Sequence, residues 1–217
     1  MAGDGHTPAA EMRGWYRFGY KLSWTLGRLF FSFKVYGRDK IPNKGPCILA
    51  MNHQSYLDPP LAGMCCRRAI YFLARKTLLE WPILGPIFPK LNVIPVDQDR
   101  ADMSALKTII KLVKSGQCTI VFPEGERSLD GQIHEAQPGL GLVIAKTLAP
   151  VVPMRIFGAH EAFPRGAKKV RLAHVRIVVG DAMQFSESDM VGSGRDLYQK
   201  LSERVMERIA AIQLPPE

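Results

Sequence analysis

The sequence predicts an α/β fold: a single domain with a largely parallel or mixed sheet flanked by helices, and an N-terminal amphipathic helical segment. Three observations support this prediction. Short apolar runs of strand length alternate along the chain with longer segments of helical periodicity. The length of 217 residues suits one large domain with a hydrophobic core. The content of 47% hydrophobic and 23% charged residues is ordinary for a globular protein.

The chain is strongly basic, with 29 Lys and Arg against 20 Asp and Glu and a net charge of +9. This balance favours polyanions, anionic membranes or phosphorylated substrates. Nucleic acid is not an expected partner, because the cations are spread without a recognisable binding module. No apolar run reaches the roughly 20 residues that a spanning helix needs, and the first ten residues do not resemble a signal peptide. We therefore expect a peripheral or monotopic protein on the cytoplasmic face of a membrane.

The four cysteines have no metal-type spacing, and two of them lie in strand-like runs. They are Cys47, Cys65, Cys66 and Cys118. An adjacent pair is a poor start for a structural disulfide. We expect all four to be small buried hydrophobes in a reducing compartment.

The N-terminal region consists of residues 1–11, expected to be disordered, and residues 12–36, expected to form an amphipathic helix. No acidic residue occurs between Glu11 and Asp39. On a helix with about 100° between residues, four cations fall within an arc of roughly 80°. These cations are Arg13, Arg17, Lys21 and Arg28. The apolar side chains that fall around the opposite side are Trp15, Phe18, Leu22, Leu26, Leu29 and Phe33.

This distribution is typical of a helix that lies in a membrane interface, with cations directed at anionic headgroups. The alternative is an amphipathic helix that packs on the domain and keeps its basic face in water. Both readings place the helix before the main domain, which is expected over residues 37–217.

Apolar runs bounded by Gly, Pro or polar residues predict the strands of this domain. Pro95 places one strand at a sheet edge, because proline cannot donate to a strand ladder. One or two further strands are expected within residues 170–179, where hydrophobic residues alternate. The remaining strands are expected at residues 47–51, 70–74, 92–96, 118–122 and 151–157.

Helical periodicity predicts the elements between and after these strands. The clearest helix covers residues 102–115, with apolar residues on one face, lysines on the other and Gly116 as its end. A helix at residues 138–149 is rich in small residues that allow close packing. A short helix is expected at residues 59–68, and an amphipathic helix at residues 195–213 closes the chain.

Two loops that follow apolar strands carry the candidate catalytic chemistry. Loops beyond the carboxyl ends of parallel strands are where α/β folds place functional groups. The first loop contains His53 and, four intervening residues later, Asp58. Histidine can take and return a proton near neutral pH, and a carboxylate can fix its tautomer. If the substrate brings the hydroxyl, this pair is sufficient for acyl transfer. The alternative is that His53 is a satisfied loop or core histidine.

The second loop runs from Phe122 to Ser128 and has the composition of an anion-binding turn. Gly125 permits a tight turn with positive φ, and Arg127 offers the planar fork that binds phosphate in a bidentate way. Ser128 adds a hydroxyl donor. The alternative is a solvated polar turn around Glu124 and its neighbours.

Together these loops resemble motifs of the glycerolipid acyltransferases, most closely the 1-acylglycerol-3-phosphate acyltransferases. The family motif N-H-x-x-x-x-D is matched by Asn52, His53 and Asp58, and F-P-E-G-T-R-S is matched by the loop 122–128 except at Glu126. A fourth motif resembles residues 149–154. A second, G-x-I-x-V-D-R, is partly present at residues 92–98, where Gln98 replaces its arginine. The resemblance covers roughly residues 35–180.

The resemblance implies that His53 and Asp58 deprotonate a lysolipid hydroxyl that attacks an acyl thioester. It implies that Arg127, with Glu124 and Gly125 shaping the loop, positions the acceptor headgroup, and Lys76 and Arg100 are further candidate phosphate contacts. The expected reaction converts 1-acyl-glycerol-3-phosphate to phosphatidic acid, with acyl-CoA or acyl carrier protein as donor. The resemblance implies neither a metal nor a bound organic cofactor. Gln98 and Glu126 leave open another lysolipid acceptor, and a non-catalytic peripheral lipid-binding protein is the alternative from another class.

Overall fold

The computed structural model describes residues 12, 14–82, 85–96 and 101–216, without the side chains of residues 101 and 102. Its central sheet has five strands in the order β1-β7-β6-β2-β5, and a two-stranded sheet, β3-β4, lies beside it. The strands of the central sheet are β1 (Lys34–Tyr36), β2 (Cys47–Met51), β5 (Cys118–Val121), β6 (Val151–Phe157) and β7 (Arg176–Val179). The smaller sheet consists of β3 (Phe72–Arg75) and β4 (Val93–Val96).

The strand directions place several loops at one edge of the molecule. β2 lies between β5 and β6 and is parallel to both. A parallel bridge between Tyr71 and Thr119 joins the start of β3 to β5, and β3 is parallel to β4. β7 is antiparallel to β6 and parallel to β1, so the sheet is mixed. The carboxyl ends of β2, β3, β5 and β6 therefore share one edge.

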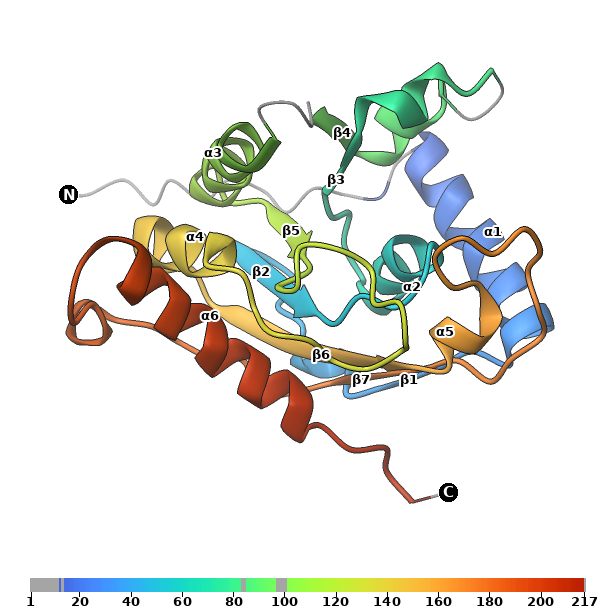
Figure 1. Cartoon of the computed structure of the whole chain (residues 1–217). Helices are drawn as coiled ribbons and strands as arrows, with labels where there is room; N and C mark the ends of the chain where they lie inside the picture. The colour runs from blue at the N-terminus through green and yellow to red at the C-terminus, as the bar shows by residue number, and fades with distance from the viewer. Residues whose placement is uncertain (1–11, 13, 83–84, 97–100, 217) are drawn as a thin grey trace.

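Helices cover both faces of the sheet (Figure 1). Ile48 and Ala50 of β2 belong to the core under α3 (Ala101–Lys114), α4 (Gly139–Thr147) and α6 (Gly194–Ala211). Leu49 and Met51 point to the opposite face, into the core under α2 (Asp58–Cys65), α5 (Ala159–Ala162) and the end of α1 (Gly14–Phe31). β2 is buried on both faces, as expected for a central parallel strand. The α/β prediction with flanking helices is confirmed. Short 3-10 helices occur at Arg38–Lys40, Lys76–Glu80, Phe88–Leu91 and Glu187–Asp189.

The N-terminal helix is shorter than the sequence suggests. α1 ends at Phe31, Ser32 adopts a left-handed conformation with φ of 42°, and residues 34–36 form strand β1. The expectation of one helix over residues 12–36 is therefore wrong at its C-terminal end. Phe33, expected on the apolar face of the helix, is 4% exposed and packs in the domain core. The helical projection fails there because the helix has already ended.

The outer side of α1 is apolar. The helix packs against α2, and its buried residues are Tyr16, Gly27 and Phe31. Trp15, Phe18 and Leu29 are 50%, 59% and 70% exposed, and Leu22, Leu26 and Phe30 are exposed beside them. No helix among the described residues is both long and apolar enough to cross a membrane.

The remaining elements agree with the predictions to within a few residues. Where one or two strands were expected over residues 170–179, the structure has one, β7, which covers only Arg176–Val179, so the expectation is wrong for residues 170–175. The predicted disorder of residues 1–11 lies outside the described residues. All four cysteines are buried free thiols, as expected, and burial raises the pKa of Cys65, Cys66 and Cys118.

Candidate functional site

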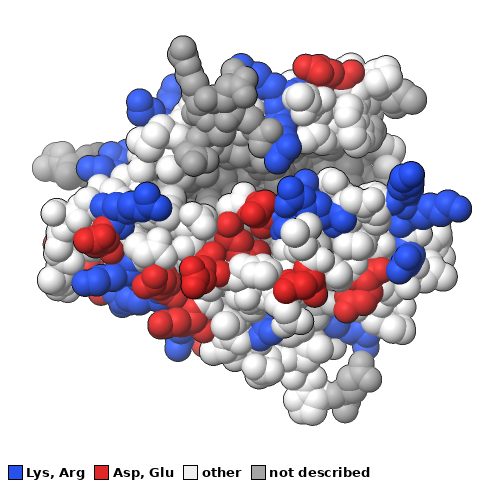
Figure 2. Space-filling view, viewed as in Figure 1, with Lys and Arg blue, Asp and Glu red and all other residues white. Residues whose placement is uncertain are grey.

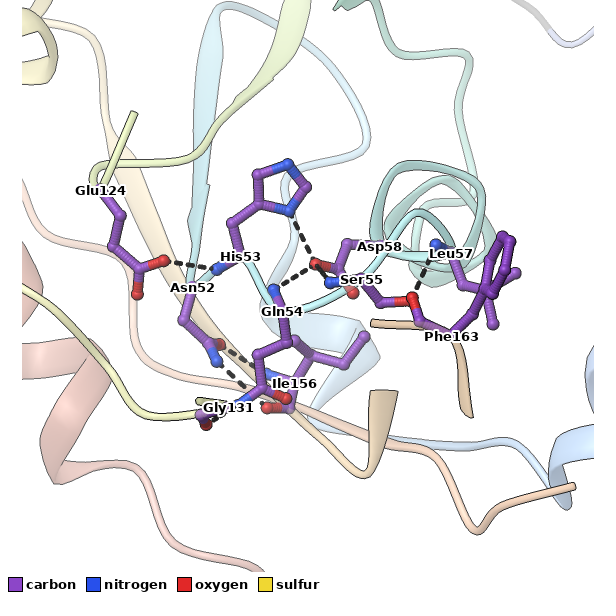
Figure 3. A network of polar contacts seen from close by, with 10 residues as sticks. All are labelled: Asn52, His53, Gln54, Ser55, Leu57, Asp58, Glu124, Gly131, Ile156 and Phe163. Atoms are coloured by element: carbon purple, nitrogen blue, oxygen red, sulfur yellow. Dashed lines mark hydrogen bonds and ion pairs between the residues drawn. The ribbon is translucent and has the colours of Figure 1, made fainter. Parts of the chain in front are cut away.

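The structure joins His53 to Asp58 directly after β2. Nδ1 of His53 lies 2.7 Å from Oδ2 of Asp58, and the carboxylate is fully buried. The same oxygen accepts the backbone N–H groups of Gln54 and Ser55 at 2.6 and 2.7 Å. Figure 3 shows these three contacts converging on one oxygen, with the second ring nitrogen of His53 directed away from the carboxylate. The carboxylate fixes a proton on Nδ1, which leaves Nε2 as the atom that can accept a proton.

Local sequence explains why Asp58 turns back toward the loop. Asp58 is the first residue of α2, and prolines follow it in the first turn, where a missing N–H costs little. The helix N-terminus favours a carboxylate through its partial positive charge. The side chain also satisfies loop N–H groups that would otherwise be buried without a partner. The His-x-x-x-x-Asp spacing therefore corresponds to a loop in which the side chain of Asp58 accepts hydrogen bonds from the backbone of the loop.

The loop after β5 holds the backbone of His53 from the other side. Oε2 of Glu124 accepts the N–H of His53 at 3.0 Å, and the N–H of Ser128 donates to the carbonyl of His53 at 2.8 Å. The ring of Phe122 stacks on the imidazole with centroids 3.9 Å apart. Three contacts from one loop thus fix the position of the candidate base. The structure therefore brings the two loops together around His53.

Glu124 is a buried carboxylate with an unusual titration. It is 5% exposed, and burial raises its pKa to about 7. Its Oε1 has no hydrogen-bond partner among the described residues. Gly125 follows with φ of 79°, in the left-handed region that the turn requires. We expected both residues to shape the headgroup loop, and the structure gives Glu124 the additional task of holding His53.

Arg127 lies at the rim of the same site. Its guanidinium carbon lies 4.0 Å from the centroid of the Tyr56 ring, which fixes the plane of the fork. Burial lowers the pKa of Arg127, and the nearby Arg75 and Arg165 lower it further. Its Nε is buried and has no partner among the described residues. Arg127 thus has an unused donor in a region of positive potential, which suits an anion.

The hydroxyl of Ser128, expected as a donor in the headgroup loop, has a partner within its own loop. Its hydroxyl is buried and donates to Asp130 at 2.8 Å, while its N–H supports His53. Asp130 also accepts from the backbone of Gln132, and these hydrogen bonds lower the pKa of its carboxyl. Ser128 thus helps to hold the loop, and its contact with the acceptor stays a prediction.

The two outlying candidates have different outcomes. Lys76 is exposed and begins the 3-10 helix directly after β3, at the same sheet edge as the two loops. Arg100 and Gln98 lie outside the described residues. Among the residues that the structure describes, no cluster of three or more His, Cys, Asp or Glu side chains is placed to hold a metal.

The sequence assigned no task to three residues at the site, although Asn52 is part of a matched family motif. The amide of Asn52 bridges the backbone of Ile156 in β6, accepting at 2.8 Å and donating at 3.2 Å. The ring of Tyr56 lies against the guanidinium of Arg127. Arg165 forms an ion pair of 2.7 Å with Glu126. The positions of Asn52 and Tyr56 within the His53 loop were a usable signal, whereas nothing in the sequence connects Arg165 to residues 39 positions earlier.

The chain is similar to known acyltransferases over this whole region. A family model described as Acyltransferase matches residues 32–157. The chloroplastic 1-acyl-sn-glycerol-3-phosphate acyltransferase BAT2 of Brassica napus is 29% identical over 167 residues, which cover 75% of this chain and 48% of that protein. The 1-acyl-sn-glycerol-3-phosphate acyltransferase of Bacillus subtilis is 24% identical over 187 residues, covering 83% of this chain and 87% of that protein.

A solved structure shares the fold. The crystal structure of the 1-acyl-sn-glycerophosphate (LPA) acyltransferase PlsC from Thermotoga maritima matches with a TM-score of 0.69 at 25% identity. The match covers 92% of this chain and 81% of that chain. The chain spans about half the length of the plant relatives, with 48% and 46% coverage of two of them.

Proposed function

The protein belongs to the Acyltransferase family, and from this premise we propose that it transfers an acyl chain from a thioester to the free hydroxyl of a lysolipid. The observation that carries the proposal is the 2.7 Å contact between His53 and the buried carboxylate of Asp58. A protein that only binds lipid has no need of a histidine oriented in this way. We therefore prefer catalysis over a non-catalytic lipid-binding role.

The mechanism follows from the proton positions at this pair. Nε2 of His53 takes the proton of the acceptor hydroxyl while the hydroxyl oxygen attacks the thioester carbonyl. Asp58 stabilises the imidazolium that forms. The tetrahedral intermediate collapses with cleavage of the C–S bond, and the imidazolium returns its proton to the thiolate leaving group. The donor is acyl-CoA or acylated acyl carrier protein. The products are the acyl ester of the acceptor and the free thiol of CoA or of the carrier protein.

The proposed acceptor is 1-acyl-glycerol-3-phosphate, which gives phosphatidic acid in phospholipid biosynthesis. A phosphate monoester suits Arg127, whose buried Nε is unpaired among the described residues and whose neighbour Arg75 adds positive charge. Glu126 could repel such a ligand, but its ion pair with Arg165 offsets its charge. With Glu126 offset in this way, the positive charge of Arg127 and Arg75 favours a phosphate acceptor over a neutral lysolipid. Lys76 and Arg100 remain proposed as further phosphate contacts.

We propose that the exposed side of α1 rests in the membrane interface. This exposed side is not the side that contacts the domain, since the buried residues Tyr16, Gly27 and Phe31 lie on another face of the helix. The exposed apolar residues fall within an arc of about 120° on a helical projection. Exposure of such an apolar stripe to water is unfavourable, and burial of the stripe in lipid removes this cost. This supports peripheral or monotopic attachment, which we place on the cytoplasmic face.

One experiment tests the enzymatic proposal. Purified protein and His53→Ala are incubated with labelled acyl-CoA or acyl carrier protein and a panel of lysolipids, and products are identified by mass. We expect phosphatidic acid from the wild type, and a loss of at least about a thousandfold in the variant. Unchanged turnover by a folded His53→Ala variant would refute the assignment of the base. Release of free fatty acid without acceptor would indicate a thioesterase.

A further inference from the structure

The loop between α5 and β7 has a composition that the proposed reaction does not use. We call residues 164–174 the basic loop. The chain carries no acidic residue between Glu161 and Asp181. Lys168, Lys169 and Arg171 are exposed, and no ion pair joins them to any described residue. Figure 2 shows Lys and Arg gathered on the side of the molecule where this loop lies in Figure 1. This stretch is therefore a local source of positive potential.

Large aliphatic side chains alternate with these cations. Val170 is 53% exposed and Leu172 is 78% exposed. A single exposed aliphatic residue needs no explanation. Two of them interleaved with three uncompensated cations form the combination that binds lipid surfaces, because the cations attract anionic headgroups and the aliphatic groups enter the acyl region.

The backbone of the basic loop is held in place. The N–H of Ala167 donates to the carbonyl of Pro164 at 3.1 Å, and the N–H of Arg171 donates to the carbonyl of Ala162 at 2.8 Å. These hydrogen bonds join the loop to the residues at its start, and the side chains of Lys168–Leu172 are exposed to solvent. Little conformational entropy is lost when an already ordered loop binds.

The two ends of the basic loop connect the site to α1. At one end, Arg165 pairs with Glu126. At the other, the N–H of Val175 donates to the carbonyl of Phe31, the last residue of α1, at 2.9 Å. The guanidinium of Arg176 donates to the carbonyl of Ser32 at 2.9 Å. The loop thus spans from the rim of the candidate site to the end of the helix proposed to lie in the membrane.

We infer that the basic loop is a second membrane-docking element, which binds anionic phospholipid headgroups through Lys168, Lys169 and Arg171 and inserts Val170 and Leu172. An acidic carrier protein would also attract the cations. The bilayer is favoured because the loop adjoins the end of α1 and exposes two aliphatic side chains. The inference uses the proposed membrane position of α1, but it does not depend on the acyl-transfer reaction.

The charge requirement is tested with vesicles of phosphatidylcholine alone or mixed with phosphatidylglycerol. We expect Lys168→Glu/Lys169→Glu/Arg171→Glu to weaken co-sedimentation with the anionic vesicles at least about tenfold at low salt, since each cation near such a surface contributes several-fold. Lys107→Glu/Lys111→Glu/Lys114→Glu on α3 makes the same change in net charge and serves as the control. Equal losses in both variants would mean that only bulk charge matters, and the inference would fail.

Insertion is tested with a fluorophore that responds to its environment. The four native cysteines are buried, so Leu172→Cys can be labelled selectively, and Val191→Cys, in the segment before α6, provides an equally exposed control. We expect a blue shift on adding anionic vesicles for the label at position 172 and none at position 191. An unshifted label at position 172 overturns the inference, whether or not the protein binds through α1.

A third measurement separates lipid from carrier protein. Val170→Ser/Leu172→Ser should lower binding to anionic vesicles while leaving turnover of a short-chain, water-dispersed acceptor with acyl-CoA unchanged. If this variant binds vesicles normally, and the charge-reversal variant loses only transfer from acyl carrier protein, the loop docks that protein and our inference is wrong. All vesicle readouts are independent of turnover, so failure of the enzymatic proposal would not affect them.

Discussion

At the scale of single residues, the position of the proposed base, His53, depends on one oxygen of Asp58. Oδ2 of Asp58 accepts hydrogen bonds from the imidazole of His53 and from two backbone N–H groups. The carboxylate therefore both orients His53 and stabilises the conformation of its loop. Substitutions at Asp58 therefore affect the tautomer and the loop together. His53 is the cleaner residue for testing catalysis, because its side chain does not hold the backbone.

The ion pair between Glu126 and Arg165 makes a prediction about acceptor binding. Arg165→Ala leaves a negative charge beside Arg127 and should raise the KM for a phosphate-bearing acceptor about two- to fivefold, because the pair is exposed and exposed pairs are weak. Glu126→Thr/Arg165→Ala removes both charges and should return KM close to the wild-type value. KM for the thioester is measured in parallel and should not change. A double variant as impaired as Arg165→Ala would contradict charge compensation.

The buried carboxyl of Glu124 predicts a pH dependence of stability. The folded protein holds this proton more tightly than the unfolded chain does. The free energy of unfolding should therefore fall as pH rises from about 4.5 to about 7 and remain constant above that. The fall from this group is at most about 3 kcal/mol.

Glu124→Gln removes the titrating group, so the fall between these pH values should be smaller in the variant. Urea unfolding midpoints from pH 5 to pH 8 provide the measurement. Glu135→Gln, at an exposed carboxyl, is the control. Parallel curves for the wild type and Glu124→Gln would show that Glu124 does not titrate in this range.

At the scale of elements, the contact between α4 and α6 depends on one glycine. A Cβ at Gly141 would lie 1.8 Å from the carbonyl oxygen of Tyr198. The N–H of Gly141 also donates to the hydroxyl of Ser202 at 2.8 Å. Close approach of the two helices is thus possible only without a side chain here, which confirms the expectation from the small residues of this helix.

Gly141→Ala should therefore destabilise the fold by about 2–3 kcal/mol, because the backbone of α6 must move. The melting temperature of a chain of this length should drop by at least about 5 °C. Gly139→Ala is the matched control, since its Cβ would meet only the flexible side chain of Leu106 at 3.2 Å. Equal melting temperatures for the two variants would contradict this account of the packing.

The elements also show where sequence reasoning succeeds and fails. β2 and β5 are short apolar runs buried in the sheet, so hydrophobicity alone locates them and the loops that follow. The end of α1 was missed because the apolar pattern continues through Phe33, while the turn at Ser32 depends on backbone conformation. Arg165 was missed because its partner, Glu126, is distant in sequence and the pairing exists only in the folded chain.

At the scale of the whole molecule, the exposed side of α1 predicts a separation of stability from membrane binding. Trp15→Ser/Phe18→Ser/Leu29→Ser should reduce partition into vesicles at least about tenfold, because these side chains would lose their burial in lipid. The free energy of unfolding should change by less than about 0.5 kcal/mol per substitution, since they are exposed in the folded protein.

Co-sedimentation and urea unfolding on the same preparations provide the two readouts. Met103→Ser/Leu214→Ser, at exposed hydrophobic residues outside α1, is the control. A large loss of stability in the α1 variant would indicate that the stripe packs on protein. Unchanged partition would remove α1 from the membrane interface.

The contacts around His53 also determine when the chain can first become active during synthesis. The backbone of His53 is held by Glu124 and Ser128, and the preceding Asn52 is bonded to Ile156, 104 residues further along. A nascent chain that stops before Ile156 contains the histidine and the aspartate but lacks part of the framework that holds them. We therefore expect the proposed transferase site to be complete only after β6 has been made.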